Sequence, residues 1–319
     1  MSILIYAESD NGKIRKGAFE IASYAKGIAD QMSSSVTAVV VNADNADELF
    51  KYGVSKVLSV KNESLNSFSV QQYASVVSAV AESESAQLVV LSSSADSKYL
   101  APFVGVKLSA AVVSNVVSLP KSVTPFVVER TAFTNKAFQL TEVNSEVKVL
   151  SLSSNSFGII ESSVEGSIED FAPEVGSSGT TVTGVDKATD KVSIADAEVV
   201  VSGGRGLKGP ENWNLIEDLA DVLGAATACS KPVSDMGWRP HGEHVGQTGK
   251  PVASNLYIAI GISGAIQHLA GINASKVKVV INTDPEAPFF KAADYGIVGD
   301  AFEVVPKLID KLKAFKAAN

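Results

Sequence analysis

The first half of the chain alternates between short apolar runs and longer segments with apolar residues at helical spacing. Lys16–Met32 places alanine, isoleucine and methionine side chains three and four positions apart, which predicts an amphipathic helix, and Val70–Ala81 follows the same pattern. The short runs are rich in β-branched residues and predict strands at Ile3–Ala7, Val36–Val41, Val54–Val60 and Gln87–Leu91. This alternation indicates a mostly parallel sheet covered by helices.

Two further apolar runs, Phe126–Thr131 and Glu146–Leu152, predict strands with no helix between them. Because parallel neighbours need a long crossover, we expect these two strands to be an antiparallel addition to the sheet. Ser92–Ser94 follows a predicted strand, where ligands bind in open parallel sheets, but a serine-rich turn is the simpler interpretation. We identify no functional cluster in this half of the chain.

The second half alternates again between strand-like and helix-like segments. Trp213–Leu223 is amphipathic with Gly224 placed to end it, and Lys307–Phe315 predicts a closing helix. Short apolar runs predict strands at Glu198–Ser202, Ala225–Cys229, Tyr257–Ile260, Val277–Ile281 and Ile297–Val298. We therefore predict an α/β chain of two domains, each a mostly parallel sheet flanked by helices, with a Rossmann-like N-terminal domain.

The segment Glu161–Lys191 separates the two halves. It is rich in Ser, Gly, Thr and Asp, and its apolar periodicity lapses, as is typical of a connection between domains. We place the first domain at residues 1–187 and the second at residues 188–319.

Composition narrows the class of protein. The chain has 319 residues, of which 45% are hydrophobic and 19% charged, so it has enough apolar residues for packed cores. Its net charge of −8 argues against a general nucleic-acid binder. A single cysteine, Cys229, excludes an internal disulfide and fits a reducing compartment, so we expect a cytoplasmic protein. We expect no signal or transit peptide and no membrane span.

The most informative stretch is Val245–His268, which predicts a glycine-rich loop, a buried strand and a helix. Ser263 and Gly264 are expected to open the helix, whose unpaired N–H groups and positive dipole end suit a phosphate. The dinucleotide motif G-x-G-x-x-G is absent. Gly249–Lys250 resembles the end of a P-loop, but Pro251 replaces the required Ser or Thr, which argues against nucleotide hydrolysis.

Several polar residues are candidates for ligand contact. Arg205 lies in a glycine-flanked turn, and Ser230 and Lys231 follow a strand end. Asn282 and Asp300 follow the ends of two other predicted strands.

Histidines and the cysteine admit plainer interpretations. His241 and His244 suggest a metal site, but surface histidines are the better interpretation because no further ligand is near in sequence. His268 suits a ligand contact and a structural role equally. Cys229 is expected to be a small buried hydrophobic residue rather than a nucleophile.

Five motifs of the second half occur together: SGGRGLKGPENW (Ser202–Trp213), VGQTGK (Val245–Lys250), LYIAIGISGAIQHLAG (Leu256–Gly271), INTDPEAPFF (Ile281–Phe290) and ADYGIVGDAFEVVP (Ala293–Pro306). Together they closely resemble the α subunits of electron-transfer flavoproteins. The first half resembles this family only in its alternating pattern. The resemblance implies an FAD held mainly by the C-terminal domain.

The resemblance also implies which residues line the FAD: Arg205, Ser230, Lys231, Val245, Gly246, Gln247, Thr248, Ser263, Gly264, Ala265, Ile266, Gln267, His268, Asn282 and Asp300. Of these, Ser263–Gln267 would face the pyrophosphate, which agrees with the phosphate argument above. Thr248 and His268 would hydrogen-bond the isoalloxazine ring near N5 and O2. Asn282 and Asp300 would serve the adenosine end.

Lys231 is a departure from the family, which usually has arginine there, over the flavin. The charge survives without the planar guanidinium. A cation near the ring is expected to stabilise the reduced, anionic flavin and raise its potential.

The family is a heterodimer, so the resemblance implies a separate β subunit that usually holds AMP. The first domain would be a scaffold against that subunit, and the second would swing with its FAD about a flexible connection near residues 187–195. Electrons would arrive from acyl-CoA or related dehydrogenases, as in fatty acid β-oxidation, and leave for a membrane quinone oxidoreductase. The chain would then be a redox carrier rather than an enzyme.

Two other functions stay open at this point. A flavin- or NAD-dependent oxidoreductase subunit, including an electron-bifurcating variant, would need a proton-transfer group, for which His268 is the candidate. A regulatory module that binds a nucleotide would use the same sheet edge without redox chemistry.

Overall fold

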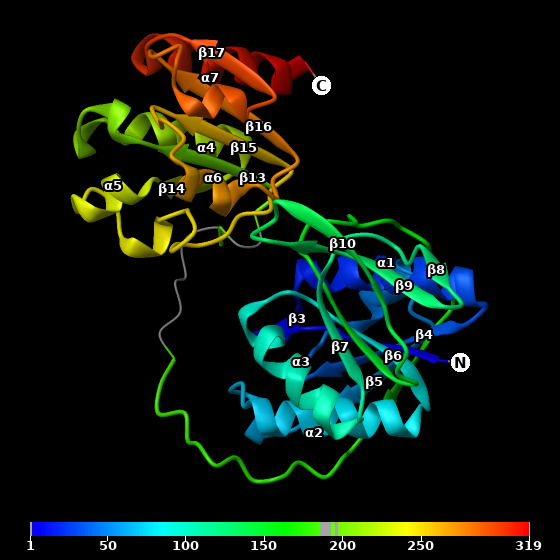
Figure 1. Cartoon of the computed structure of the whole chain (residues 1–319). Helices are drawn as coiled ribbons and strands as arrows, with labels where there is room; N and C mark the ends of the chain where they lie inside the picture. The colour runs from blue at the N-terminus through cyan, green and yellow to red at the C-terminus, as the bar shows by residue number, and fades with distance from the viewer. Residues whose placement is uncertain (1, 186–192, 195–196, 319) are drawn as a thin grey trace. The chain divides into compact units, whose positions relative to one another are not determined.

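The computed structural model describes residues 2–185, 193–194 and 197–318, and the chain forms two compact units, Met1–Asp186 and Lys187–Asn319 (Figure 1). The predicted domain boundary between residues 187 and 188 lies outside the described residues and stays a prediction. The same holds for the predicted flexible connection near residues 187–195, of which only 193 and 194 are described. None of the helices in the described parts combines the length and apolar composition needed to cross a membrane.

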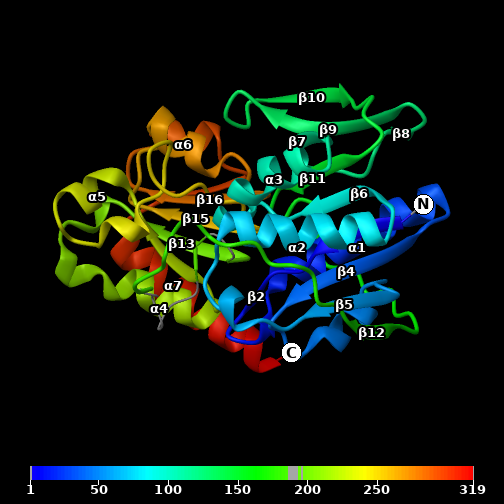
Figure 2. The ribbon, with the colours of Figure 1, turned by 90° about the horizontal axis from the view of Figure 1, so that it is seen from below.

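The first unit is built on a sheet that the described residues form from ten strands (Figure 2). Its elements in chain order are β1 (Ser2–Tyr6), β2 (Ser9–Asp10), β3 (Lys13–Ile14), α1 (Lys16–Met32), β4 (Ser35–Val41), β5 (Lys56–Val60), α2 (Val70–Ser83), β6 (Ala86–Leu91), α3 (Ala95–Lys107), β7 (Ala111–Val116), β8 (Ser122–Val123), β9 (Phe126–Ala132), β10 (Ala137–Glu142), β11 (Lys148–Leu152) and β12 (Ser167–Asp170). Strands β2 and β3 form a separate two-stranded pair. The order across the main sheet is β10-β9-β7-β11-β6-β1-β4-β5-β12, with β8 paired to β9.

Alternation along the central strands gives this sheet two buried faces. Ile3 and Ile5 pack with Tyr24 of α1 in one apolar cluster, whereas Leu4 packs with Val77 of α2 in the other. Helix α1 therefore covers one face, and α2 and α3 cover the other (Figure 1).

The predicted antiparallel addition is only half right. Strands β9 and β10 form an antiparallel hairpin, but β11 lies between β6 and β7 and is parallel to both. The pattern of apolar residues does not give the direction of a strand. The sequence prediction also lacked β7 and β10, and without them the pairing of β9 and β11 could not be predicted. Part of the predicted connection is also a strand, because β12 pairs with β5 at the sheet edge.

The second unit has a five-stranded sheet within the described residues, and every neighbouring pair is parallel. Its elements are β13 (Val199–Gly203), α4 (Asn214–Leu223), β14 (Ala226–Cys229), α5 (Lys231–Asp235), β15 (Leu256–Ile260), α6 (Ile266–Ile272), β16 (Val277–Asn282), β17 (Tyr295–Val298) and α7 (Ala301–Ala318). The order is β14-β13-β15-β16-β17. Gly224 ends α4 with a left-handed φ of 66°, as predicted.

Helices α4 and α7 cover one face of this sheet (Figure 1). Ile216 and Val305 pack there in one apolar cluster with Ile258. The other face is covered by the segment around Val245 and by Ile272 at the end of α6. The fold prediction, an α/β chain with two mostly parallel, helix-flanked sheets, is confirmed.

Candidate functional site

The predicted site residues gather at one edge of the second sheet, because all five parallel strands end there. Arg205 follows β13, and Ser230 and Lys231 follow β14. Ser263–His268 follows β15, Asn282 ends β16, and Asp300 comes two residues after β17. Ligands bind outside the carboxyl ends of the strands in open parallel sheets, so the topology alone makes this edge a candidate site.

The sheet order reverses between β13 and β15, and glycine backbone forms this switch point. The Gly204 N–H donates to the Ile260 carbonyl at 2.8 Å, and the Gly206 N–H donates to the Gly261 carbonyl at 3.0 Å. A Cβ atom on Gly204 would lie 2.1 Å from the Gly261 oxygen, so only glycine fits. The two loops therefore contact each other through backbone atoms.

The VGQTGK loop lies against α6, although the two segments are separated along the chain by β15. The Gln247 N–H donates to the Gln267 carbonyl at 2.7 Å, and the Val252 N–H donates to the Gly271 carbonyl at 2.7 Å. The Val245 N–H donates to the Cys229 carbonyl at 3.0 Å. The loop is thereby fixed between the end of β14 and the helix that follows β15.

The prediction that Ser263 and Gly264 open this helix is wrong. Helix α6 begins at Ile266 with Ala265 as its N-cap, and Gly264 has a left-handed φ of 85°. A Cβ on Gly264 would also lie 2.6 Å from the backbone of Phe289. Ser263–Ala265 is therefore a loop that leads into a helix of seven residues.

The candidate residues divide by exposure. Those with exposed side chains or surfaces are Arg205, Lys231, Gln247, Thr248, Ser263, Ala265, Ile266 and Gln267. Asn282 and Asp300 are half-buried, and the buried ones are Ser230, Val245, Gly246, Gly264 and His268. Ile266 is the clearest exception to ordinary burial, since this large apolar side chain is 71% exposed at the start of α6. An exposed apolar residue beside polar ones suits a ligand with both kinds of surface.

His268 is buried, with only 6% of its surface exposed. Its Nε2 lies 2.9 Å from the Tyr257 hydroxyl, and its Nδ1 is buried without a hydrogen-bond partner, although the Val245 backbone nearby favours protonation. Burial, and then the neighbouring His244, lower the pKa of His268 to about 4. The imidazole is therefore neutral at pH 7.

His244 corrects the prediction of surface histidines. His241 is exposed, but His244 is only 1% exposed. Its ring lies inside the turn of the VGQTGK loop, because a Cβ on Gly249 would come within 2.9 Å of its Nδ1. Burial first, and then His241 and Lys231, lower the pKa of His244. Its position directly before the VGQTGK motif was the signal that sequence reasoning could have used.

Three polar candidates at this sheet edge have partners among the described residues. Lys231 pairs with Asp235 at 3.4 Å, with both side chains more than half exposed. The Asn282 side chain donates to the Ile262 carbonyl at 3.0 Å and so ties the end of β16 to the loop after β15. Asp300 accepts from the Phe302 N–H at 3.0 Å at the start of α7 and lies 3.7 Å from Lys208.

Cys229 is buried at the end of β14, and burial raises the pKa of its thiol to about 12. The thiol is therefore protonated and unreactive at pH 7, as the sequence prediction of a small buried residue requires. No group of three or more metal-ligating side chains occurs among the described residues.

These features fit a flavin nucleotide. The glycine switch point admits close approach to backbone N–H groups, and Ser263 and Thr248 offer exposed hydroxyls. The buried Nδ1 atom of His244 lacks a hydrogen-bond partner in this structure, and a bound ligand or water would supply one.

Comparison with known proteins decides the family. A sequence model described as "Electron transfer flavoprotein domain" matches residues 3–175, and one described as "Electron transfer flavoprotein FAD-binding domain" matches residues 193–273. The chain belongs to the electron transfer flavoprotein family. The resemblance seen in the five motifs of the second half is thereby confirmed, and it extends to the first half as well.

Relatives named "Electron transfer flavoprotein subunit alpha" align along nearly the whole chain. Those of Thermoanaerobacterium thermosaccharolyticum and Bacillus subtilis are each 35% identical and cover 98% of this chain, with 98% and 97% of their own lengths covered. A probable mitochondrial counterpart from Caenorhabditis elegans is 37% identical over 96% of this chain and 92% of its own. A putative thiamin diphosphate-dependent enzyme from Mycobacterium smegmatis aligns at 9% identity over 96% of this chain and 59% of its own, and its TM-score of 0.26 is too low to inform function.

Membership of the electron transfer flavoprotein family settles the type of protein. The family consists of redox carriers rather than enzymes, and it implies a flavin cofactor and a β-type partner subunit. The prediction of a redox carrier is confirmed at this level.

Proposed function

We propose that this chain is the α subunit of a heterodimeric electron carrier that passes electrons from acyl-CoA or related dehydrogenases to a membrane quinone oxidoreductase. The observation that supports it best is the convergence of the candidate residues on the carboxyl edge of the second sheet, around the Gly204–Gly261 contact. This edge lies in the segment that matches the FAD-binding domain. When bound, FAD supplies the redox chemistry, and the residues of the chain hold and orient it.

We assign the parts of the site by their surroundings. The loop and helix start Ser263–Gln267 would hold the pyrophosphate, since all of these residues except the buried Gly264 are exposed and Ser263 offers a hydroxyl. Asn282 and Asp300 would serve the adenosine end, because they follow the outer strands β16 and β17. Arg205, after β13, and Lys231, after β14, would add positive charge at the switch point.

Thr248 and His268 would contact the isoalloxazine ring. Thr248 is exposed on the loop that is hydrogen-bonded to α6, and His268 lies on that helix. Because burial keeps His268 neutral, it would contribute a hydrogen bond without adding a charge. Lys231 would then be the nearby cation that tunes the flavin, as the usual arginine does in the family.

The first unit would be the scaffold that binds the β subunit, which we expect to hold AMP. Helix α3 exposes Tyr99 and Val106 at 68% and 82%, and the β9–β10 hairpin exposes Phe133 and Phe138 at 82% and 70%. Large apolar side chains in such numbers are typical of a surface that a partner covers. We place the boundary between scaffold and FAD domain at residues 187/188 and the heterodimer in the cytoplasm.

The experiment is to purify the chain with its β-type subunit and measure bound FAD by absorbance and release. We expect a yellow complex that, once reduced, passes electrons to a dye and turns over no organic substrate. Steady turnover of an organic substrate by the complex alone would favour the oxidoreductase alternative. A colourless complex that takes up no FAD would refute the proposal.

A variant pair tests the assigned site. Arg205→Ala is expected to weaken FAD binding about 10- to 100-fold, the range of a hydrogen bond to a charged group. Lys311→Ala, on the exposed side of α7, removes the same charge and should leave the FAD affinity unchanged. Equal losses in the two variants would show that Arg205 acts only through net charge.

A further inference from the structure

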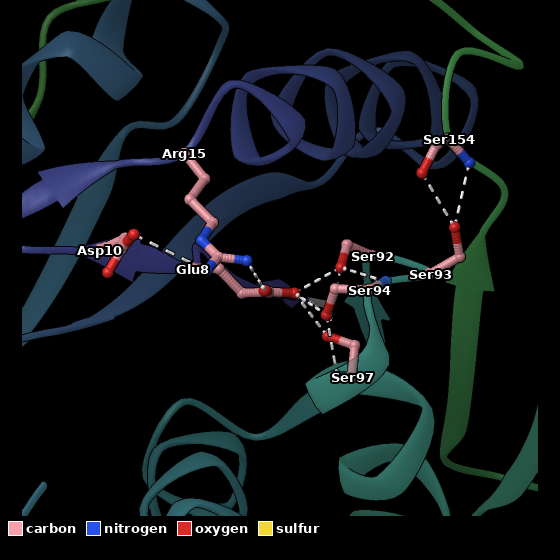
Figure 3. Close-up of polar contacts among 8 residues, drawn as sticks. All are labelled: Glu8, Asp10, Arg15, Ser92, Ser93, Ser94, Ser97 and Ser154. Atoms are coloured by element: carbon pink, nitrogen blue, oxygen red, sulfur yellow. Dashed lines mark hydrogen bonds and ion pairs between the residues drawn. The ribbon is translucent and has the colours of Figure 1, made fainter. Parts of the chain in front are cut away.

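A buried carboxylate lies at the end of the central strand of the first unit. Glu8 follows β1 and is only 6% exposed. One of its oxygens, Oε1, accepts hydrogen bonds from the hydroxyls of Ser92, Ser94 at 2.8 Å and Ser97 at 2.7 Å (Figure 3). The other, Oε2, lies 3.7 Å from a guanidinium nitrogen of Arg15.

This position is the switch point of the first sheet. Strand β1 has β4 on one side and β6 on the other, so the direction of winding reverses between β1 and β6. The serines follow β6 and enter α3, a helix of 13 residues whose N-cap is Ser94. Anionic ligands bind at such places in other parallel sheets, because the helix start and the strand ends both favour them. The Glu8 carboxylate itself occupies the position of the anion.

The surroundings of Glu8 are those of a ligand site rather than of an ordinary ion pair. Three side-chain donors converge on one oxygen, and they come from a segment more than 80 positions away in sequence. Ser92 is held in turn, because its Oγ accepts from the Ser94 N–H at 3.1 Å. Buried donors arranged around a carboxylate lose free energy when the carboxylate is removed and nothing replaces it.

The charged residues near Glu8 determine what charge a bound anion can carry. Arg15 is a cation beside Glu8, and it also lies 3.9 Å from Asp10 (Figure 3). Asp96, on the first turn of α3, adds a further negative charge. A dianion would meet more repulsion there than a monoanion.

We propose that the first unit contains a binding site for a carboxylate monoanion, and that the chain fills this site with its own Glu8. The site is closed to external ligands as long as Glu8 is present. This inference concerns the first unit alone and does not depend on the proposed function of the second.

Chemical rescue tests it. In the full chain loaded with FAD, Glu8→Ala empties the position, and calorimetry follows melting in sodium acetate against sodium chloride at equal ionic strength. Acetate is expected to raise the melting temperature of Glu8→Ala by roughly 2–8 °C in a saturable way. The unaltered chain should show no such response, because its site is filled.

Two further variants make the test specific. Glu8→Gln removes the charge but keeps the side-chain volume, so acetate has no space to enter and should not rescue it. The double variant Glu8→Ala/Ser97→Ala lacks a donor and should respond at least about tenfold more weakly to acetate. Should Glu8→Ala fail to fold in chloride, its refolding yield in acetate is the same readout. Equal effects of acetate on the unaltered chain, Glu8→Ala and Glu8→Gln would overturn the proposal.

Discussion

Both units have a switch point beside the first strand of their sheet, but they build it differently. In the first unit, the Glu8 side chain enters the position between β1 and β6 and receives three serine hydroxyls. In the second unit, the position between β13 and β15 is made of backbone at Gly204, Gly206 and Gly261. Topology therefore determines where a site can be, and a few side chains determine whether it is filled or open.

The largest effect is expected where the loops at Gly204 and Gly261 contact each other. Gly204→Ala places a methyl group 2.1 Å from the Gly261 oxygen, and both loops are backbone-bonded, so neither can move away cheaply. We expect a loss of ~4 kcal/mol or more in the stability of the second unit. Denaturant unfolding followed by Trp213 and Trp238 fluorescence measures it, since both tryptophans of the chain lie in this unit.

Gly242→Ala is the matched control, because a Cβ there meets nothing within 4 Å. It should change the stability by less than about 0.5 kcal/mol. Equal effects of the two substitutions would mean that the close approach of Gly204 and Gly261 is unimportant.

A second test concerns His268, a buried histidine of the second unit; the first unit contains no histidine. The pKa of His268 falls from an ordinary 6.5 to about 4 on folding, so the unfolded chain binds the proton more tightly. Its contribution to stability is complete above pH 6.5, declines as the pH falls to 4, and then levels off, a total on the order of 3 kcal/mol. Tryptophan-monitored unfolding between pH 4 and 7 checks this for the second unit.

His268→Gln should flatten that pH dependence, leaving the smaller part that His244 contributes in the same direction. An unchanged pH profile in His268→Gln would show that other groups cause the loss of stability in acid.

A third test sharpens the comparison by giving the second unit its own carboxylate. Ser263→Glu introduces a negative charge in the loop that leads into α6, where we propose that the pyrophosphate binds. Like-charge repulsion should weaken FAD binding about 10- to 100-fold, as measured by fluorescence titration of the released cofactor. Ser263→Gln has nearly the same size and should lose much less affinity; equal losses would point to steric exclusion.

The smallest effect is expected at Lys231. Its side chain is more than half exposed and pairs with Asp235, so water and a counter-charge screen it. Lys231→Ala should lower the flavin midpoint potential by the equivalent of at most ~1 kcal/mol, and Lys231→Arg should restore it. Spectroelectrochemical titration of the complex measures the midpoint potential. A raised potential in Lys231→Ala would contradict the assignment of Lys231 as the cation near the flavin.

The sequence predicted the alternation of elements well, because apolar spacing along segments such as Lys16–Met32 reports burial directly. It did not predict that β11 runs parallel in the middle of the sheet, since that depends on which distant strands pair. It also started α6 too early, because Ser263 and Gly264 favour a helix start by composition, whereas the left-handed backbone of Gly264 is a tertiary requirement.

The candidate site was predicted from motifs, and the structure brings its residues to one sheet edge. The Glu8 cluster was not predicted, because Glu8 and Ser97 are far apart in sequence and neither belongs to a recognisable motif. The sequence places Ser92–Ser94 after a strand end and predicts a serine-rich turn there. It does not show that these hydroxyls bind Glu8, because the contact depends on the tertiary structure.

The Glu8 cluster also has a consequence for how the gene can change. Codons for glutamate lie a single base from codons for alanine and glycine. One such mutation removes the carboxylate and leaves Arg15 and the hydroxyls of Ser94 and Ser97 in place. A single base change in the Glu8 codon would therefore convert the first unit into a protein with an open anion site.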